Sequence, residues 1–454
     1  MKGTVHYETR GEIALLSIDN PPVNPLSSGV RQGLFDGMTK ALADEAVKAV
    51  VITGLNRAFI AGADISEFGA AASEGVGLGE ALEIMENSTK PVIAAINGTA
   101  FGGGLETALC CDYRIAAPTA PVGLPEVKLG LLPGAGGTQR LPRLIGAQAA
   151  LKAIVSGDPI MAPQAQKLGI VDRIAEGDIV EEGIKYAEEI VAAGSATRKI
   201  RDLTDKIAGD KGNTAVFENA AAQLNKTNRG QFAPAQILKC VEAAVNADSF
   251  DAGMAVEREC FAACMQDPQR EALIHIFFAE RAANKIPGLS KDDPLIDINK
   301  GSVIGSGTMG GGIAMCFANA GIPVRLHDNN AENLAKGLKV IEGNYARTVS
   351  KGRLTQEAMD KRMSLIIPTE NFDDLGDADV VIEAVYENLD LKKEIFAKLD
   401  KVMKPGALLA TNTSGLDVDA IANMTSRPEF VCGMHFFSPA NVMRLLEVVR
   451  GDAS

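Results

Sequence analysis

Hydrophobic and polar positions follow two different periods in the first part of the chain. Three short runs are rich in β-branched and other apolar residues, as expected of strands buried on both faces: residues 13–18, 50–54 and 91–96. Between the first two runs, apolar side chains at every fourth position predict one face of an amphipathic helix: Val30, Leu34, Met38 and Leu42. A second helix is expected from about Leu105. This alternation predicts an α/β domain.

The pattern becomes helical from about residue 149 to residue 283, where Ala, Glu and Lys are frequent. A polar stretch rich in Pro and Gly follows, and strand–helix alternation then starts again. Strands are expected up to Ile304 and over residues 323–328 and 379–383, with a helix from Gly307, which is the order of a doubly wound parallel sheet. The predicted organisation has four parts: an α/β core at 1–190, a helical appendage with a linker helix at 191–284, a connector at 285–297 and a second α/β domain at 298–454.

Composition narrows the function. The 454 residues include 45 basic and 58 acidic side chains, and the net charge of −13 argues against nucleic-acid binding. An anionic ligand must therefore be held locally, by helix N-termini or single basic residues. There is no apolar run of about 18 residues, so no membrane span is expected, and the polar N-terminus lacks the apolar segment of a secretory signal. The seven cysteines have no CxxC spacing and are accompanied by four histidines, which supports neither a metal site nor a disulfide framework.

Two acidic residues lie beside glycine-rich turns. Glu106 ends the segment Gly-Gly-Gly-Leu-Glu at 102–106, and Glu126 ends Gly-Leu-Pro-Glu at 123–126. Taken alone, Glu106 is explained by the helix dipole and Glu126 as an exposed loop charge. Their combination with bare backbone suggests a catalytic site, because amide groups in such turns can stabilise a developing oxyanion. Small residues at 61–64 offer a second candidate donor.

These segments resemble the enoyl-CoA hydratase (crotonase) family. The resemblance is ordered over residues 5–145 and rests on four motifs: Ala-Gly-Ala-Asp-Ile at 61–65, Asn-Gly-x-x-x-Gly-Gly-Gly-x-Glu at 97–106, Gly-x-Pro-Glu at 123–126 and Pro-Gly-Ala-Gly-Gly-Thr-Gln-Arg at 133–140. It implies a crotonase fold in which the amides of Ala63 and Gly103 form an oxyanion hole for a CoA thioester carbonyl. It also implies that Glu106 and Glu126 lie on either side of the reacting Cα–Cβ bond.

Hydration of a conjugated thioester needs a base for water, a proton source for Cα and stabilisation of an enolate oxygen. Two carboxylates in opposite protonation states can serve the first two needs, and two amides the third. Many relatives keep a single carboxylate and isomerise, hydrolyse or cleave their substrates, so the presence of both favours hydration. Glu126 could also move a proton between carbons, which leaves Δ3–Δ2 isomerisation as a second use.

A dinucleotide-binding fingerprint opens the second α/β region. Gly305, Gly307 and Gly310 form GxGxxG after an expected strand and at the start of an expected helix, and Asp328 ends the next strand. In this context the glycines admit a pyrophosphate to the helix N-terminus, and the carboxylate accepts the ribose hydroxyls. A carboxylate there would repel a 2′-phosphate, so NAD is favoured over NADP, with nearby Arg325 as a reservation.

His435 is followed twelve residues later by Glu447. A histidine beside two phenylalanines is ordinarily a core residue. Together with the fingerprint, however, the segments Glu-Asn at 387–388, Lys392 and Thr-Asn-Thr-Ser at 411–414 resemble the L-3-hydroxyacyl-CoA dehydrogenase family. That resemblance implies that His435 takes the proton of a 3-hydroxyl while Glu447 orients the imidazole. It also implies that Ser414 binds the substrate hydroxyl or the cofactor, and that the NAD site is lined by Met309, Asp328, Glu387 and Lys392. Ser438 stands where single-function dehydrogenases usually carry Asn and where peroxisomal-type multifunctional enzymes carry Ser.

Both halves in this order resemble the multifunctional enzymes of fatty-acid β-oxidation, with acyl-CoA thioesters as substrates and NAD as cofactor. Because the family continues beyond the strand of Glu447, we expect a C-terminally truncated chain whose dehydrogenase activity is impaired. Two alternatives remain open: a hydratase/isomerase with an inert second half, and a non-catalytic acyl-CoA or NAD-binding module. A bacterial cytoplasmic location is expected, or a peroxisomal one in a eukaryote. A thiolase partner is conceivable, and the sequence leaves the oligomeric state and acyl chain length open.

Overall fold

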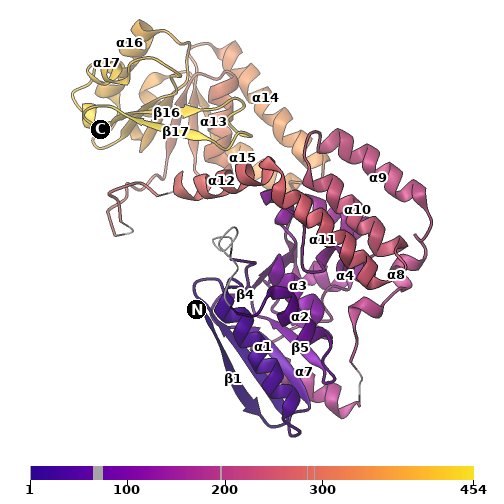
Figure 1. Cartoon of the computed structure of the whole chain (residues 1–454). Helices are drawn as coiled ribbons and strands as arrows, with labels where there is room; N and C mark the ends of the chain where they lie inside the picture. The colour runs from indigo at the N-terminus through magenta and orange to yellow at the C-terminus, as the bar shows by residue number, and fades with distance from the viewer. Residues whose placement is uncertain (1, 65–74, 195–196, 284, 291) are drawn as a thin grey trace. The chain divides into compact units, whose positions relative to one another are not determined.

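The computed structural model describes residues 2–64, 75–194, 197–283, 285–290 and 292–454 (Figure 1). Ile65, the last residue of the first glycine motif, lies outside the described residues. The chain forms two compact units, Met1–Gly288 and Leu289–Ser454. The boundary between them falls inside the expected connector at 285–297.

The main sheet of the first unit has six strands in the order β1-β2-β3-β5-β7-β10. β1 pairs antiparallel with β2, and the remaining neighbours are parallel. The bounds are Thr4–Arg10 for β1, Ile13–Asp19 for β2, Ala49–Gly54 for β3, Val92–Ile96 for β5, Tyr113–Ala116 for β7 and Arg173–Ile174 for β10. The three apolar runs of the sequence thus lie on β2, β3 and β5, and burial on both faces explains why they lack polar alternation.

Helices cover both faces of this sheet. α1 (Ser28–Ala43) packs against β1 and β2, and α7 (Ile179–Ala192) packs against β3 and β5 on the opposite face (Figure 1). The predicted face of α1 needs one correction, because Ala41 is fully buried while Leu42 is only partly so. A residue eleven positions after Val30 returns to its face of the helix, whereas one twelve positions later is turned well away.

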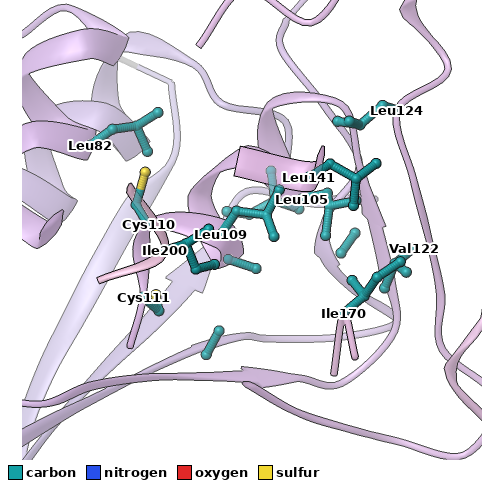
Figure 2. Close-up of a cluster of buried hydrophobic side chains, with 14 of the residues drawn as sticks. Leu82, Leu105, Leu109, Cys110, Cys111, Val122, Leu124, Leu141, Ile170 and Ile200 are labelled. Carbon is teal, nitrogen blue, oxygen red and sulfur yellow. The ribbon is translucent and has the colours of Figure 1, made fainter. Parts of the chain in front are cut away.

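A smaller four-stranded sheet, in the order β4-β6-β8-β9, carries the glycine turns. Its strands are Ala58–Ile60 (β4), Thr99–Phe101 (β6), Pro121–Gly123 (β8) and Ile160–Met161 (β9). The elements around it are α2 (Leu78–Glu86), α3 (Gly103–Cys110), the 3-10 helix η2 (Glu126–Leu129) and α4 (Gly137–Ile145). Leu105 and Leu109 of α3 lie with Leu141 of α4 in one buried cluster, which fixes α3 in place (Figure 2). The helix expected from about Leu105 begins two residues earlier, at Gly103.

Short strands interrupt the helical part of the first unit. Its helices are α5 (Ala147–Ser156), α6 (Ala162–Leu168), η3 (Ile200–Asp202), α8 (Asp205–Ala208), α9 (Thr214–Thr227), α10 (Ala233–Asn246), α11 (Phe250–Gln266) and α12 (Pro268–Ala283). α10 packs against α4, α5 and α11, and α11 also contacts α4. The appendage therefore adjoins the helix that follows the last glycine motif.

The second unit contains a seven-stranded sheet in the order β13-β12-β11-β14-β15-β16-β17. All neighbours are parallel except β16 and β17. Its strands are Gly301–Ile304 (β11), Val324–His327 (β12), Ile366–Thr369 (β13), Val380–Glu383 (β14), Leu408–Thr411 (β15), Val431–Phe436 (β16) and Leu446–Arg450 (β17). The strand order reverses between β11 and β14, and this is where doubly wound sheets bind ligands.

Two hydrophobic cores, one on each face of this sheet, confirm the doubly wound prediction. One core includes α13 (Thr308–Asn319), α14 (Ala331–Ser350) and α15 (Gln356–Ser364), and the other includes α16 (Leu389–Val402) and α17 (Val418–Ala422). Short 3-10 helices, η4 (Phe372–Asp377) and η5 (Pro428–Phe430), precede β14 and β16. No helix in the described part of the chain is both long and apolar enough to cross a membrane. The seven thiols are free, and five of them are buried.

Candidate active sites

Glu106 lies in the first turn of α3 and is only 2% exposed. Its Oε1 accepts hydrogen bonds from the amides of Ala135 and Gly137, each at 2.8 Å. A Cβ on residue 137 would lie 2.9 Å from this oxygen, so glycine permits the close approach. Burial raises the pKa of Glu106, and the two amide hydrogen bonds act against that rise because they stabilise the charged form.

Glu126 is the first residue of η2 and is in a different environment. Its Oε2 is buried and has no hydrogen-bond partner, while its Oε1 lies 2.9 Å from the position that a Cβ on Gly102 would occupy. Burial and the charge of Glu106 raise the pKa of Glu126 well above its usual range. Both pKa values are therefore raised, that of Glu126 well above its usual range, and the two groups differ in that Glu106 accepts from two amides whereas Glu126 Oε2 accepts from none.

The amides of Ala63 and Gly103 lie next to each other. A Cβ on Gly103 would be 3.8 Å from the Ala63 nitrogen and 2.8 Å from Leu26 Cδ1. Gly103 is the first residue of α3, so its amide has no acceptor within the helix. The turn before Ala63 depends on Gly62, which has a φ of 122°, and the Gly62 carbonyl is fixed by the Leu26 amide at 2.9 Å. The two segments that carry the predicted oxyanion donors therefore lie close together.

A third carboxylate, Glu257 of α11, reaches the same region. It is fully buried, and it accepts hydrogen bonds from the amides of Gly136 and Thr138 at 2.7 and 3.1 Å and from the Thr138 hydroxyl. Burial and the charge of Glu106 raise the pKa of Glu257 to about 8. Glu257 was not predicted from the sequence. The available signal was a lone acid on an otherwise small and apolar helix stripe that includes Gly253, Cys260 and Cys264.

In the second unit, each fingerprint glycine has a separate structural reason. Gly305 has a φ of 97°, and a Cβ there would lie 2.7 Å from the Ala384 carbonyl. A Cβ on Gly310 would overlap the Gly305 carbonyl, so this glycine permits close packing of the helix on the strand. Gly307 differs, because a Cβ there would meet nothing within 4 Å. Its missing side chain leaves room for a ligand at the N-terminus of α13.

A cavity of about 1240 Å³ opens over this turn. Its lining includes Gly305, Gly307, Met309 and Asp328, whereas Gly310 lies behind it in the turn. Asp328 Oδ2 accepts from the Ser306 amide at 3.0 Å and from the Ser306 hydroxyl at 2.7 Å. Burial acts to raise the pKa of Asp328, but these hydrogen bonds outweigh it and the pKa is lowered. The carboxylate is therefore charged.

His435 and Glu447 are directly opposite each other on β16 and β17. His435 Nδ1 lies 2.7 Å from Glu447 Oε2, and the histidine side chain is 20% exposed. The end of β16 is tied to the end of β15, because the Phe436 amide donates to Asn412 Oδ1 at 2.8 Å. The structure thus forms the predicted pair where β16 ends and the antiparallel β17 begins, beside the carboxyl end of β15.

The other residues predicted for the second unit differ in their surroundings. Ser414 donates from its amide and its hydroxyl to Glu387 Oε1, at 2.8 and 3.1 Å. Ser438 is exposed. Lys392 needs a correction as a lining residue, because its side chain is only 1% exposed and its ammonium lies 2.8 Å from the buried carboxylate of Glu383. The ammonium also lies 3.4 Å from Glu387, so Lys392 helps to hold Glu387 in place from a buried position.

Comparison with known proteins gives one family match on each side of the boundary between the two units. Residues 8–232 match the family model for enoyl-CoA hydratase/isomerase, and residues 300–454 match that for the NAD binding domain of 3-hydroxyacyl-CoA dehydrogenase. The match to each family is confined to one of the two units. The expected crotonase-like and NAD-binding folds are thereby confirmed.

Relatives that contain both parts extend further than this chain. The chain is 43% identical over 447 residues to the peroxisomal bifunctional enzyme of Cavia porcellus, an alignment covering 96% of this chain and 60% of that protein. It is also 43% identical to the peroxisomal bifunctional enzyme of Homo sapiens, covering 97% and 61%. For the peroxisomal fatty acid beta-oxidation multifunctional protein AIM1 of Arabidopsis thaliana the identity is 38%, covering 96% and 62%. The chain spans about three fifths of the length of these relatives.

Proposed function

We propose that the first unit hydrates trans-2-enoyl-CoA thioesters to 3-hydroxyacyl-CoA. The observation that carries the proposal is the unequal treatment of two neighbouring carboxyl groups. Glu106 is held by two amides, which favour its charged form, whereas Glu126 Oε2 is buried without a partner beside that charge. Burial raises the pKa of both groups, but hydrogen bonds from two amides oppose the rise only at Glu106, and two carboxyl groups in such unequal surroundings are suited to act as base and acid in one reaction.

In this mechanism the amides of Ala63 and Gly103 bind the thioester oxygen and stabilise the enolate that develops there. Glu106 takes a proton from water, and the resulting hydroxyl adds to Cβ. Glu126 gives its proton to Cα, so the double bond is consumed and both carboxyl groups exchange protonation states. Because Oε1 of Glu106 is engaged by Ala135 and Gly137, Oε2 is the oxygen assigned to the water. Glu126 could also carry a proton between carbons, which would give Δ3–Δ2 isomerisation.

For the second unit we propose NAD binding and oxidation of the 3-hydroxyl that hydration creates. The residues fit the cofactor, since the open space at Gly307 lies at a helix N-terminus and Asp328 presents a charged carboxylate to the cavity. NAD, when bound, supplies the two-electron acceptor for this oxidation. His435 would accept the hydroxyl proton at the nitrogen that does not face Glu447, and Glu447 would stabilise the resulting imidazolium. Met309, Glu387, Ser414 and Ser438 remain proposed contacts.

Arg325 gives little reason to expect binding of the 2′-phosphate of NADP. Its guanidinium forms an ion pair with Asp377, so the positive charge is already matched. The neighbouring Asp328 would repel such a phosphate. This arrangement supports NAD over NADP.

Together the two activities would form consecutive steps of fatty-acid β-oxidation, with acyl-CoA thioesters as substrates. A thiolase partner and the location stay predictions: bacterial cytoplasm, or the peroxisome in a eukaryote. The alternatives are a hydratase/isomerase whose second unit is inert, and a binding module with no activity.

One coupled assay separates these alternatives. The protein is mixed with crotonyl-CoA, and loss of the enoyl thioester absorbance reports hydration. NAD is then added and NADH absorbance is followed. Hydration with NADH formation supports both proposals, and hydration alone supports the inert second unit. Thioester binding without hydration would overturn the first proposal and leave the binding module.

A further inference from the structure

We infer that Glu257 is a positioning residue for hydration, acting on Glu106 through the turn at residues 135–138. The inference rests on the proposed function of the first unit. Glu257 is separated from this turn by about 120 residues of chain and reaches it from α11 of the helical appendage. The appendage would then be part of the catalytic apparatus.

The backbone of the turn divides its amides between two buried carboxylates. The amides of Ala135 and Gly137 donate to Glu106 Oε1, and those of Gly136 and Thr138 donate to Glu257. Four consecutive N–H groups therefore alternate between the two acids. A backbone that tilts to release one acid must also change its contacts with the other, so the hold on Glu257 fixes the geometry at Glu106.

One face of α11 packs along the same turn. A Cβ on Gly134 would lie 2.6 Å from the Phe261 ring, and one on Gly136 would lie 3.3 Å from Met254 Sδ. A Cβ on Gly253 would overlap the side-chain oxygen of Gln139. This close packing leaves the turn little room to shift and places Glu257 at its centre. A buried acid satisfied by backbone amides is a rigid support for the groups on the other side of that backbone.

The charged and titratable groups facing Glu257 come from four other elements. They are Glu106 of α3, Glu126 of η2, Arg140 of α4 and Cys240 of α10. Of these, Arg140 is itself paired with Glu86 at 2.8 Å. With a pKa of about 8, Glu257 becomes negatively charged in the alkaline range, and that charge contributes to the raised pKa of Glu126. Removal of that charge should therefore make Glu126 lose its proton at lower pH.

The test is Glu257→Gln in the full chain, assayed by crotonyl-CoA hydration. The amide keeps the size of the side chain, but its NH₂ group cannot accept from an N–H, and the charge is lost. We expect kcat to fall by about 10- to 100-fold, as small misplacements of a catalytic group can cause, with KM little changed. We also expect the alkaline limb of the pH profile to move to lower pH.

Asp112→Asn is the matched control. Asp112 is another fully buried carboxylate that accepts from two backbone amides, those of Val92 and Arg198, at 2.9 and 2.7 Å. Its loss should lower thermal stability without moving the pH profile. An equal fall in kcat for both variants, or an unmoved alkaline limb in Glu257→Gln, would reduce Glu257 to a structural residue and overturn the inference.

Two further measurements keep the inference testable. Thr138→Val removes the hydroxyl that donates to Glu257 and accepts from Gln139 Nε2, while the Thr138 amide keeps its bond to Glu257, so it should lower kcat in the same direction and by less. Amide hydrogen exchange follows the turn without any assay: exchange at Ala135 and Gly137 should accelerate in Glu257→Gln. If the wild-type protein does not hydrate thioesters, the proposed function fails, and unchanged exchange would separately overturn the coupling between the two acids.

Discussion

The carboxylates of the two units are held in different ways. In the first unit, Glu106 and Glu257 are buried and are bound by backbone amides of one turn. In the second unit, Asp328 is bound mainly by the neighbouring Ser306, and the Glu447 side chain is 51% exposed. The first arrangement shifts pKa values upward through burial, whereas in the second, hydrogen bonds lower the pKa of Asp328 and the Glu447 side chain is open to solvent.

This difference matches the chemistry proposed for each unit. Hydration needs one carboxyl group that keeps its proton near neutral pH, which only a buried site next to another charge provides. Binding of ribose hydroxyls and orientation of an imidazole need charged acceptors, which exposed or locally bonded carboxylates provide. The substitutions below test this division between buried and accessible acids.

The largest effect is expected for Glu106→Gln. The amide oxygen can still accept from Ala135 and Gly137, so the fold should be kept, but the side chain can no longer take a proton from water. Loss of a general base lowers the rate by roughly 10²- to 10⁴-fold. Steady-state hydration of crotonyl-CoA measures the loss, and NAD binding by the second unit should be unaffected. Near-normal hydration in a folded variant would remove Glu106 from the mechanism.

Lys392→Met tests the buried ion pair between Lys392 and Glu383 in the second unit. Its removal leaves Glu383 charged at 0% side-chain exposure, and such a loss destabilises a protein by about 3–5 kcal/mol. Chemical denaturation of the second unit measures the change.

Two variants serve as controls for that prediction. Lys128→Met removes a partner of Asp158 from an exposed pair and should change stability by less than about 1 kcal/mol. Adding Glu383→Gln to Lys392→Met should restore part of the loss, since no buried charge then remains. If Lys392→Met were as mild as Lys128→Met, the burial of this pair would be irrelevant to stability.

Asp328→Asn should weaken NAD binding by an amount typical of a lost hydrogen bond to a charged group, about 1.5–3 kcal/mol. It should also narrow the preference for NAD over NADP, because the negative charge facing a 2′-phosphate is gone. Titration calorimetry with each nucleotide measures both effects. Asp373→Asn, at another acid lining the cavity, is the control and should keep the preference. An unchanged preference in Asp328→Asn would locate nucleotide selection elsewhere.

The smallest effect separates two glycines of one motif. Gly307→Ala should leave stability unchanged, because φ is −69° and a Cβ meets nothing, yet it should weaken NAD binding by about tenfold, or 1.4 kcal/mol. Gly310→Ala should instead cost about 1–3 kcal/mol of stability through overlap with the Gly305 carbonyl. Thermal unfolding and NAD titration of both variants measure these effects. Equal changes of stability and of NAD affinity in the two variants would contradict the prediction.

Much of the fold could be predicted from local patterns. The apolar runs at 13–18, 50–54 and 91–96 became strands of one sheet because each is short, β-rich and bounded by turn residues. The face of α1 was predicted with an error of one position, since a strict four-residue spacing drifts away from the helical period. Gly305 and Asp328 were found because the motif that joins them occupies only about two dozen consecutive residues.

By itself, the sequence determined the order of elements and the glycine turns, since these depend on backbone conformation and residue type over short stretches. Its resemblance to two families predicted the roles of Glu106, Glu126, His435 and Glu447. Only the tertiary structure decided which acid is held by amides, that Lys392 lies beneath its site, and that Glu257 reaches the turn at 135–138 from a distant helix. The reason is physical: desolvation and amide direction are properties of packing between segments, and no single segment carries them.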